Sequence, residues 1–156
     1  MPHHQQTSSS IEISPLRPAD QARWLVLWKE YQQFYTVELP AAVTEGTWRR
    51  LHDGKLHGFG ARDAAGELMG IVHYLFHEDT WSLQRACYLQ DLYVDPRARG
   101  TGCAHQLIEA VVAAAQHAGT NPPYWLTHET NTRARKLYDR VARNHGFLQY
   151  VYEPPK

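Results

Sequence analysis

The stretch that decides the fold is YLQDLYVDPRARGTGCA, residues 88–104. An apolar run ends there at an Asp-Pro turn, two arginines and two glycines follow, and an apolar periodic segment then begins. This order predicts a strand, a glycine-containing turn and the first turn of a helix. The unpaired N–H groups and the positive dipole end of such a helix attract phosphate, and Arg97 and Arg99 add positive charge there. The turn therefore predicts an anion-binding site.

Two common phosphate-binding motifs do not fit this turn. A P-loop requires Gly-Lys-Ser/Thr, whereas Gly102 is followed by Cys103 and Ala104. The dinucleotide fingerprint requires a third glycine where His105 stands, and an acidic residue about twenty positions later. Nucleotide binding through this loop is therefore disfavoured.

Composition narrows the class of protein. The chain has 156 residues, enough for one domain, and its sixteen basic and sixteen acidic side chains give a formal charge of zero. A general nucleic-acid binder would carry a basic excess. The ten histidines are expected to be scattered on the surface. The polar residues 1–10 predict a disordered tail before a single domain over 11–156.

The cysteines and the hydropathy pattern suggest a compartment. Cys87 and Cys103 show no metal-ligand spacing and no disulfide framework, which predicts free thiols in a reducing environment. No apolar stretch approaches the length of a membrane span, and the N-terminus lacks the apolar core of a signal peptide. We expect a cytoplasmic protein.

Periodicity and turn residues predict alternating helices and strands. Trp24, Trp28, Tyr31 and Tyr35 recur at steps of four, three and four, which is a helical period. The expected order is strand 11–13, a helix from about 20, helix 44–51, strands 59–62, 68–76 and 87–94, helix 102–117, strand 124–127, helix 131–144 and strand 147–152. Without internal repeats or linkers, this order indicates one mixed α/β domain.

Three sets of residues resemble the GNAT superfamily of N-acetyltransferases. Arg97, Gly100 and Gly102 fit its Arg/Gln-x-x-Gly-x-Gly/Ala signature. Leu92-Tyr93-Val94 before the loop and Asn131-x-x-Ala134-x-x-Leu137-Tyr138 after the fifth strand are further family features. The region of His73, Tyr74, His77 and Trp81 is most similar to the yeast-type histone and polyamine acetyltransferase group.

The resemblance covers residues 11–152 and implies an α/β (α+β) fold. That fold has a central mixed, mostly antiparallel sheet with splayed fourth and fifth strands, flanked by helices. It also implies acetyl-CoA as co-substrate, with its diphosphate on the loop and its pantetheine arm on the strand before it. The residues implied in cofactor binding are Leu92, Tyr93, Val94, Arg97, Arg99, Gly100, Thr101, Gly102, Cys103, Ala104, Asn131 and Tyr138.

The resemblance gives Tyr138 the role of general acid toward the coenzyme thiolate. Asn131 and Tyr138 are seven residues apart, nearly two helical turns, and therefore share one helix face. Asn131 is also a good helix N-cap. A packed tyrosine with a satisfied hydroxyl is the structural alternative for Tyr138.

Two carboxylates are candidates for the base that takes the proton of the amine. Asp91 lies on the central strand, and Glu129 follows the next strand. Gln90 stands where spermidine/spermine acetyltransferases carry a Glu, so that base assignment does not transfer. Each carboxylate has a structural alternative: Asp91 as a cap or an arginine partner, Glu129 as a charge at a helix N-terminus.

Aromatic and histidine side chains are candidates for the acceptor pocket. His73 and His77 would lie about 13 Å apart on a strand, too far to chelate one metal together. We therefore expect no metal site. Aromatic rings can hold an amine cation. The expected acceptor-binding residues are Trp28, Tyr31, Tyr35, His73, His77 and Trp81, with ordinary packing as the alternative.

These observations predict an acetyl-CoA-dependent N-acetyltransferase that works by direct transfer in a ternary complex. The candidate acceptors are polyamines, amino acids, and protein or peptide amines. The alternative is a non-catalytic acyl-CoA-binding sensor, which would need only the phosphate loop. Segment 148–152 and the aromatic helix suggest a homodimer, as the resemblance implies. No nucleic-acid or membrane partner is expected.

Overall fold

The computed structural model describes residues 10–156. Residues 1–9 of the predicted N-terminal tail lie outside the described residues. The described chain divides into two compact units, one ending at Trp125 and the other comprising Leu126–Lys156.

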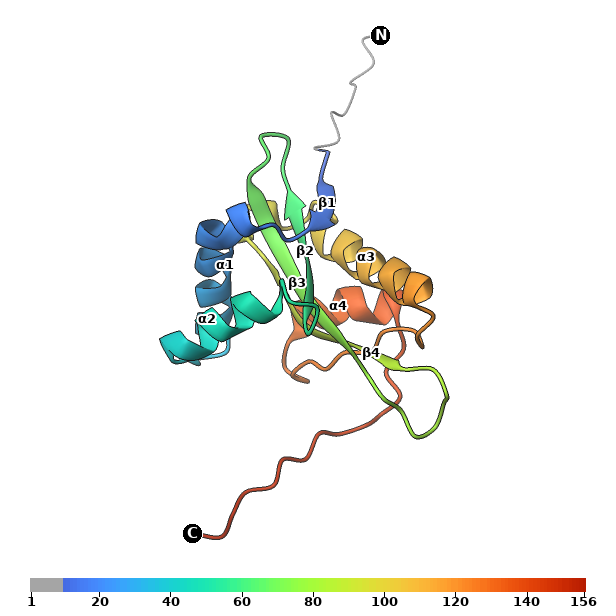
Figure 1. Cartoon of the computed structure of the whole chain (residues 1–156). Helices are drawn as coiled ribbons and strands as arrows, with labels where there is room; N and C mark the ends of the chain where they lie inside the picture. Colours follow the sequence, from blue (N-terminus) through green and yellow to red (C-terminus); the bar gives the residue numbers. More distant parts are fainter. Residues whose placement is uncertain (1–9) are drawn as a thin grey trace. The chain divides into compact units, whose positions relative to one another are not determined.

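The first unit is built on a four-stranded antiparallel sheet (Figure 1). Its strands, in spatial order, are β1 (Glu12–Pro15), β2 (His57–Arg62), β3 (Leu68–His77) and β4 (Ala86–Val94). A tight turn joins β2 to β3, and the Asp63 side chain closes it by accepting N–H bonds from Ala65 and Glu67. Neighbouring strands in the sheet are consecutive in sequence, so no crossover is needed.

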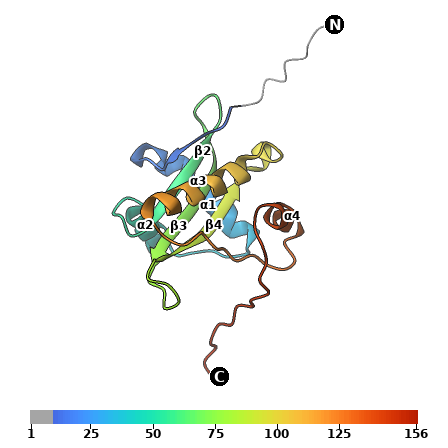
Figure 2. The same cartoon turned by 90° about the vertical axis from the view of Figure 1, so that its right-hand side faces the viewer.

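Helices cover both faces of this sheet. Helices α1 (Gln21–Phe34) and α2 (Ala41–Arg50) lie on one face, and α3 (Cys103–Ala118) lies on the other (Figures 1 and 2). Short 3₁₀ turns, Pro18–Asp20 and Pro96–Ala98, precede α1 and α3 respectively. Among residues 10–156, no helix combines the length and apolar composition needed to cross a bilayer.

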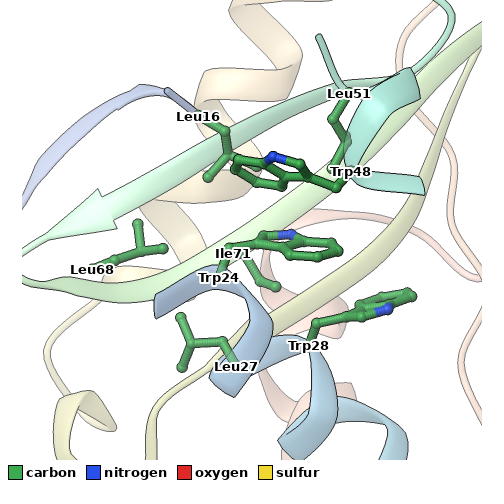
Figure 3. Packing of buried hydrophobic residues seen from close by; sticks show 8 residues of the cluster. All are labelled: Leu16, Trp24, Leu27, Trp28, Trp48, Leu51, Leu68 and Ile71. Atoms are coloured by element: carbon green, nitrogen blue, oxygen red, sulfur yellow. The ribbon is translucent and has the colours of Figure 1, made fainter. Parts of the chain in front are cut away.

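Tryptophan side chains form the core under α1 and α2. Trp24 is buried between Trp48 and Trp28, with ring centroids 4.8 Å and 5.7 Å away, and Figure 3 shows the three rings in that order. Large aromatic rings contribute much of the apolar area in such a core. On the opposite face, α3 buries Leu107, Ile108, Val111 and Ala115, as its helical periodicity predicts.

A buried ion pair connects the start of α1 to the sheet. Both side-chain nitrogens of the Arg62 fork bind Asp20, at 2.6 Å and 2.7 Å. Asp20 also accepts the backbone N–H of Arg17 at 2.7 Å. The hydrogen bond from Arg62 is the largest cause that lowers the pKa of Asp20 below its ordinary value.

We expect Asp20→Asn to lower the free energy of unfolding by about 3 kcal/mol at pH 7, because Arg62 would keep a buried charge without a partner. A carboxylate whose folded-state pKa is lowered adds stability above its unfolded pKa of about 4 and loses it as the pH falls through the folded value. Urea denaturation from pH 7 to pH 2 should therefore show a smaller acid loss in the variant. Glu12→Gln, which removes an exposed 3.9 Å pair with Arg17, is the control. A variant as stable as wild type at pH 7 would contradict the role of this pair.

Two of the predicted strands are wrong. Segment 124–127 forms only one isolated bridge among the described residues, in which Tyr124 pairs with Tyr88. Segment 147–152 forms no strand, and its large side chains are exposed. A strand needs a hydrogen-bonded neighbour, and no described residue pairs with this segment.

The second unit contains one helix, α4 (Thr132–Val141). Asn131 is its N-cap, and its side-chain oxygen accepts the N–H of Ala134 at 3.4 Å. The helix ends three residues before the predicted boundary at 144, and the chain after it has no regular structure.

Candidate active site

The turn between β4 and α3 has the predicted strand–turn–helix geometry. Asp95 caps the short 3₁₀ turn by accepting the N–H of Arg97 at 2.9 Å. Gly100 and Gly102 have φ angles of 77° and 81°, in the left-handed region that glycine adopts without steric cost. Gly102 is also the N-cap of α3. The two glycines of the motif are thus required by the backbone of the turn.

Consecutive backbone N–H groups in this turn have no acceptor among residues 10–156. Within the part of the chain that the structure describes, none of the N–H groups of residues 100–105 makes a hydrogen bond. The next amide, that of Gln106, bonds to the Gly102 carbonyl and begins the helical pattern. Unpaired amides at the start of a sixteen-residue helix form a donor set suited to a phosphate or diphosphate.

The two arginines of the turn differ in their surroundings. Arg97 lies 3.0 Å from Asp95 and 3.5 Å from Glu67, so its charge is already shared with two carboxylates. Asp95 also binds Arg23 at 2.6 Å. The Arg97 side chain is the first cause of the lowered pKa of Asp95. Arg99 is exposed and forms no ion pair with any described carboxylate, so it offers the more available positive charge.

Strand β4 leaves part of one edge open within the first unit. Its outer edge pairs with Tyr124 as far as Leu89, which donates its N–H to the Tyr124 carbonyl at 3.0 Å. In residues 10–125 no other strand continues this pairing along 90–94. An open edge presents backbone donors and acceptors to an extended ligand.

The side chains near the end of β4 contact other parts of the protein or are partly buried. The Tyr93 hydroxyl donates to Glu30 at 3.1 Å, and its ring contacts Tyr31 edge-on. Burial, together with the Glu30 carboxylate, raises the pKa of Tyr93 to about 12. Leu92 and Val94 are half-buried. The Tyr93 hydroxyl is thus bound to Glu30, whereas the backbone of 90–94 stays open on the outer edge within the first unit.

A bulge in β4 places two polar side chains beside a cavity. Asp91 pairs with His73 and Leu89 pairs with Tyr74, so Gln90 is the extra residue in the ladder. Bulges of this kind redirect side chains and often lie next to functional sites. Both Gln90 and Asp91 line the cavity.

The cavity has a volume of about 490 Å³ and lies between α1, α2, β3 and β4. This volume is typical of small-molecule sites, about 300–1,000 Å³. Aromatic and apolar side chains form most of the wall, with one arginine and one carboxylate. The lining residues include Trp28, Tyr31, Tyr35, Thr47, Arg50, His73, Gln90 and Asp91.

A buried hydrogen-bond chain holds Asp91 in this cavity. The Trp24 indole N–H donates to His73 Nε2 at 2.9 Å, and His73 Nδ1 lies 3.0 Å from Asp91 Oδ2. Because an indole nitrogen can only donate, Nε2 must be the acceptor, and the imidazole proton lies on Nδ1. His73 therefore donates to the Asp91 carboxylate and fixes its orientation, while the other oxygen, Oδ1, has no partner among the described residues.

The structure does not bring two of the predicted acceptor-binding residues to the cavity. His77 lies at the far end of β3, where its ring bonds to the Tyr124 hydroxyl at 2.8 Å and to the Glu78 carbonyl at 2.7 Å. Trp81 is 93% exposed in the loop after β3. His77 lies four positions after His73 along the extended strand, about 13 Å away, so only His73 reaches the cavity.

The second unit carries the remaining candidates. Tyr138 is half-buried on α4, and Asn131 caps the same helix. Glu129 is exposed in the turn before Asn131, where its backbone carbonyl accepts a bond from Arg135 at 2.7 Å. In the sequence, Glu129 therefore precedes the N-cap residue Asn131, and Tyr138 lies within the helix that follows it.

Two residues that no motif indicates contribute to the site: Trp24 supports His73, and Arg50 lines the cavity. Trp24 belongs to the aromatic stripe of α1, so its burial is predictable, but its bond to His73 is not. Arg50 ends α2 without any sequence signal that it faces a site. Within residues 10–156, no group of three or more potential ligands could hold a metal ion.

Comparison with known proteins identifies the family. The profile of the Acetyltransferase (GNAT) family matches residues 21–147. The chain is 40% identical over 135 residues to D-amino-acid N-acetyltransferase HPA3 of Saccharomyces cerevisiae, covering 85% of this chain and 84% of that protein. It is 29% identical over 91 residues to a mouse (Mus musculus) thialysine N-epsilon-acetyltransferase, covering 55% of this chain and 53% of that protein.

A solved structure shows the same fold. The structure of AAC(6')-Iy in complex with a CoA-containing bisubstrate analog superimposes with a TM-score of 0.81 at 20% identity, covering 95% of this chain and all of that one. The family profile spans the turn, the cavity-lining strands and α4. The chain therefore belongs to the GNAT family of acetyl-CoA-dependent N-acetyltransferases.

Proposed function

We propose that this enzyme acetylates the amine of a small amino-acid acceptor that binds in the cavity beside β4. The observation that carries the proposal is Asp91, the one carboxylate among the described lining residues, held by His73 in a wall that is mostly aromatic and apolar. A carboxylate with aromatic neighbours suits a substrate ammonium group. The name of the yeast relative, a D-amino-acid N-acetyltransferase, supports amino acids as acceptors, D-amino acids among them.

The residues of the turn fit the co-substrate. The free amides of residues 100–105, with Arg99, would hold the diphosphate of acetyl-CoA. The open edge of β4, through Leu92, Tyr93 and Val94, would hold the pantetheine arm, with Asn131 as a further hydrogen-bonding residue. When bound, acetyl-CoA supplies an activated thioester carbonyl. The backbone N–H and the side chain of Arg97 both bind Asp95, so Arg97 would stabilise the turn rather than offer a free charge.

The reaction removes two protons from the acceptor nitrogen and gives one to the departing sulfur. Asp91 takes one proton from the acceptor ammonium, directly or through water, which frees the nitrogen lone pair. The nitrogen then attacks the thioester carbonyl, so that a C–N bond forms and the C–S bond breaks. The Tyr138 hydroxyl gives its proton to the departing sulfur, and the second proton that the nitrogen loses as the amide forms restores the phenol, directly or through water. Glu129 remains the second candidate for the base.

Direct transfer fits the state of the cysteines. Cys87 and Cys103 are both buried, and burial raises the pKa of each thiol to about 11. A thiol with that pKa is protonated at neutral pH and is a poor nucleophile. An acetyl-cysteine intermediate on either residue is therefore disfavoured, and attack by the amine in a ternary complex is the simpler route.

An amine panel tests the proposed function. We expect thiol release from acetyl-CoA in the presence of D- and L-amino acids, with mass spectrometry showing the N-acetyl product. Polyamines and peptides complete the panel. Tight binding of acetyl-CoA by calorimetry, with no turnover on any amine, would instead support a cofactor sensor and reject the enzyme assignment.

We also propose that the enzyme is a homodimer. The segment after α4 exposes Phe147, Leu148, Tyr150, Val151 and Tyr152. Exposed apolar side chains in one short segment are typical of a protein–protein contact. Sedimentation equilibrium should give twice the mass of one chain, and truncation after Gly146 should give one. A monomeric full-length chain would reject this proposal.

A further inference from the structure

The Trp28 indole nitrogen is a buried donor without a partner. Trp28 is 6% exposed and lines the cavity, and its Nε1 is buried with no hydrogen-bond acceptor among the described residues. In Figure 3 the nitrogen lies on the ring edge turned away from Trp24. Leaving a buried donor unpaired costs about 1–3 kcal/mol, so such a group in a cavity wall indicates that a ligand supplies the acceptor.

Arg50 is a second donor in the same wall. Its side chain is held against its own helix, with Nε bonded to the Gly46 carbonyl and Nη2 to Thr47 Oγ1, both at 3.2 Å. Within residues 10–156 no carboxylate forms an ion pair with it. Thr47, which fixes this orientation, also lines the cavity. A guanidinium group can only donate, and its fork matches a carboxylate.

We propose that Arg50 and Trp28 bind the carboxylate of the acceptor while Asp91 binds its ammonium group. This inference rests on the proposed function and names the substrate class of that site as free, zwitterionic amino acids. The described wall has one guanidinium and one carboxylate, so it matches a molecule with one charge of each sign. Tyr31 and Tyr35 line the same cavity and would contact the acceptor side chain.

The same charges discriminate against the other acceptor classes. A polyamine has several positive charges and no carboxylate, so Arg50 would repel it and Trp28 would keep an unpaired donor. An internal peptide residue lacks a free α-carboxylate altogether. A site built to hydrogen-bond one group rejects an analogue that lacks it, because the buried Trp28 donor is then left without a partner.

The first test compares an amino acid with its amide, for example D-phenylalanine with D-phenylalaninamide. We expect wild-type kcat/KM to be about 10- to 100-fold higher for the acid, the effect of losing a hydrogen-bonded charged partner. The amide has the less basic amine and is therefore more often neutral, so this preference cannot arise from amine reactivity. Equal or better use of the amide would overturn the inference.

Arg50→Met and Trp28→Phe test the two donors. We expect Arg50→Met to bring the acid-to-amide ratio close to one by raising KM for the acid, with the amide little affected. Trp28→Phe, which keeps a ring but removes the N–H, should lower the ratio several-fold. Arg49→Met is the matched control, since Arg49 is the adjacent exposed arginine and does not line the cavity. A wild-type ratio in Arg50→Met would overturn the inference.

Failure of this inference is separable from failure of the proposed function. If both acid and amide are acetylated equally, the enzyme is an N-acetyltransferase whose pocket does not recognise the carboxylate. If neither is acetylated while acetyl-CoA still binds, the proposed function itself is rejected. The wild-type comparison needs no substitution, so it decides carboxylate recognition even where a variant is unstable.

Discussion

Asp91→Asn should lower kcat/KM for an amino-acid acceptor at pH 7 by about 100-fold or more, the range expected when a general base is removed. The α-amine of an amino acid is mostly protonated at pH 7.4, so most bound acceptor must lose a proton before it can attack. Asn has the shape of Asp but cannot take that proton. It can still accept the hydrogen bond from His73, so the cavity should keep its form.

The pH dependence separates a base from a merely structural carboxylate. In the Asp91→Asn variant, activity should rise with pH as free amine accumulates in solution, and the gap to wild type should narrow toward pH 9–10, near the amine pKa of about 10. Glu38→Gln is the matched control, because Glu38 is exposed between two cavity-lining residues but does not line the cavity itself. A profile of wild-type shape and height in Asp91→Asn would assign the base elsewhere, and Glu129→Gln tests the remaining carboxylate.

The parts of the fold that were predictable are those with strong local signals. Asp95 and Pro96 end a strand, Gly100 and Gly102 supply left-handed turn conformations, and an apolar stripe continues as α3. These features depend on residues close in sequence. The aromatic stripe of α1 likewise follows from its period, since a helix with such a stripe must bury it.

The cavity depends on pairings between residues far apart in sequence, which local patterns do not encode. The bulge at Gln90 depends on how β4 aligns with β3, and it is what lets Gln90 and Asp91 both line the site. The bond from Trp24 to His73 joins residues 49 positions apart. Arg50 carries no motif because its role depends only on where α2 packs.

In segment 147–152 the local pattern is strong, but the strand that it predicts is wrong. Its aromatic and branched residues have high β propensity, which predicts a strand, yet the strand is absent from the structure. Propensity describes how side chains suit a pleated surface; it does not supply the neighbouring strand whose backbone must pair. The exposed Phe147 and Tyr150 are the consequence, and they are also the basis of the dimer proposal.

Tyr138→Phe should lower kcat about 100-fold while changing KM for acetyl-CoA less than about threefold, because proton donation to the leaving sulfur contributes to the transition state and little to ground-state binding. The substitution removes only the hydroxyl and keeps the half-buried ring on α4. Steady-state kinetics with saturating amine give kcat, and calorimetric titration with acetyl-CoA gives the affinity independently.

A matched tyrosine in the same unit makes this result specific. Tyr150 is 90% exposed outside any helix, so Tyr150→Phe removes a hydroxyl from the same part of the chain without touching α4, and its kcat should equal that of wild type. If Tyr138 had only a packing role, its loss would lower the melting temperature and leave kcat nearly unchanged, since the folded fraction would still turn over normally. Near-wild-type kcat in Tyr138→Phe would therefore reject the acid role. A large loss of kcat at full cofactor affinity would also exclude a pure acyl-CoA sensor, because a sensor has no turnover for a phenol to support.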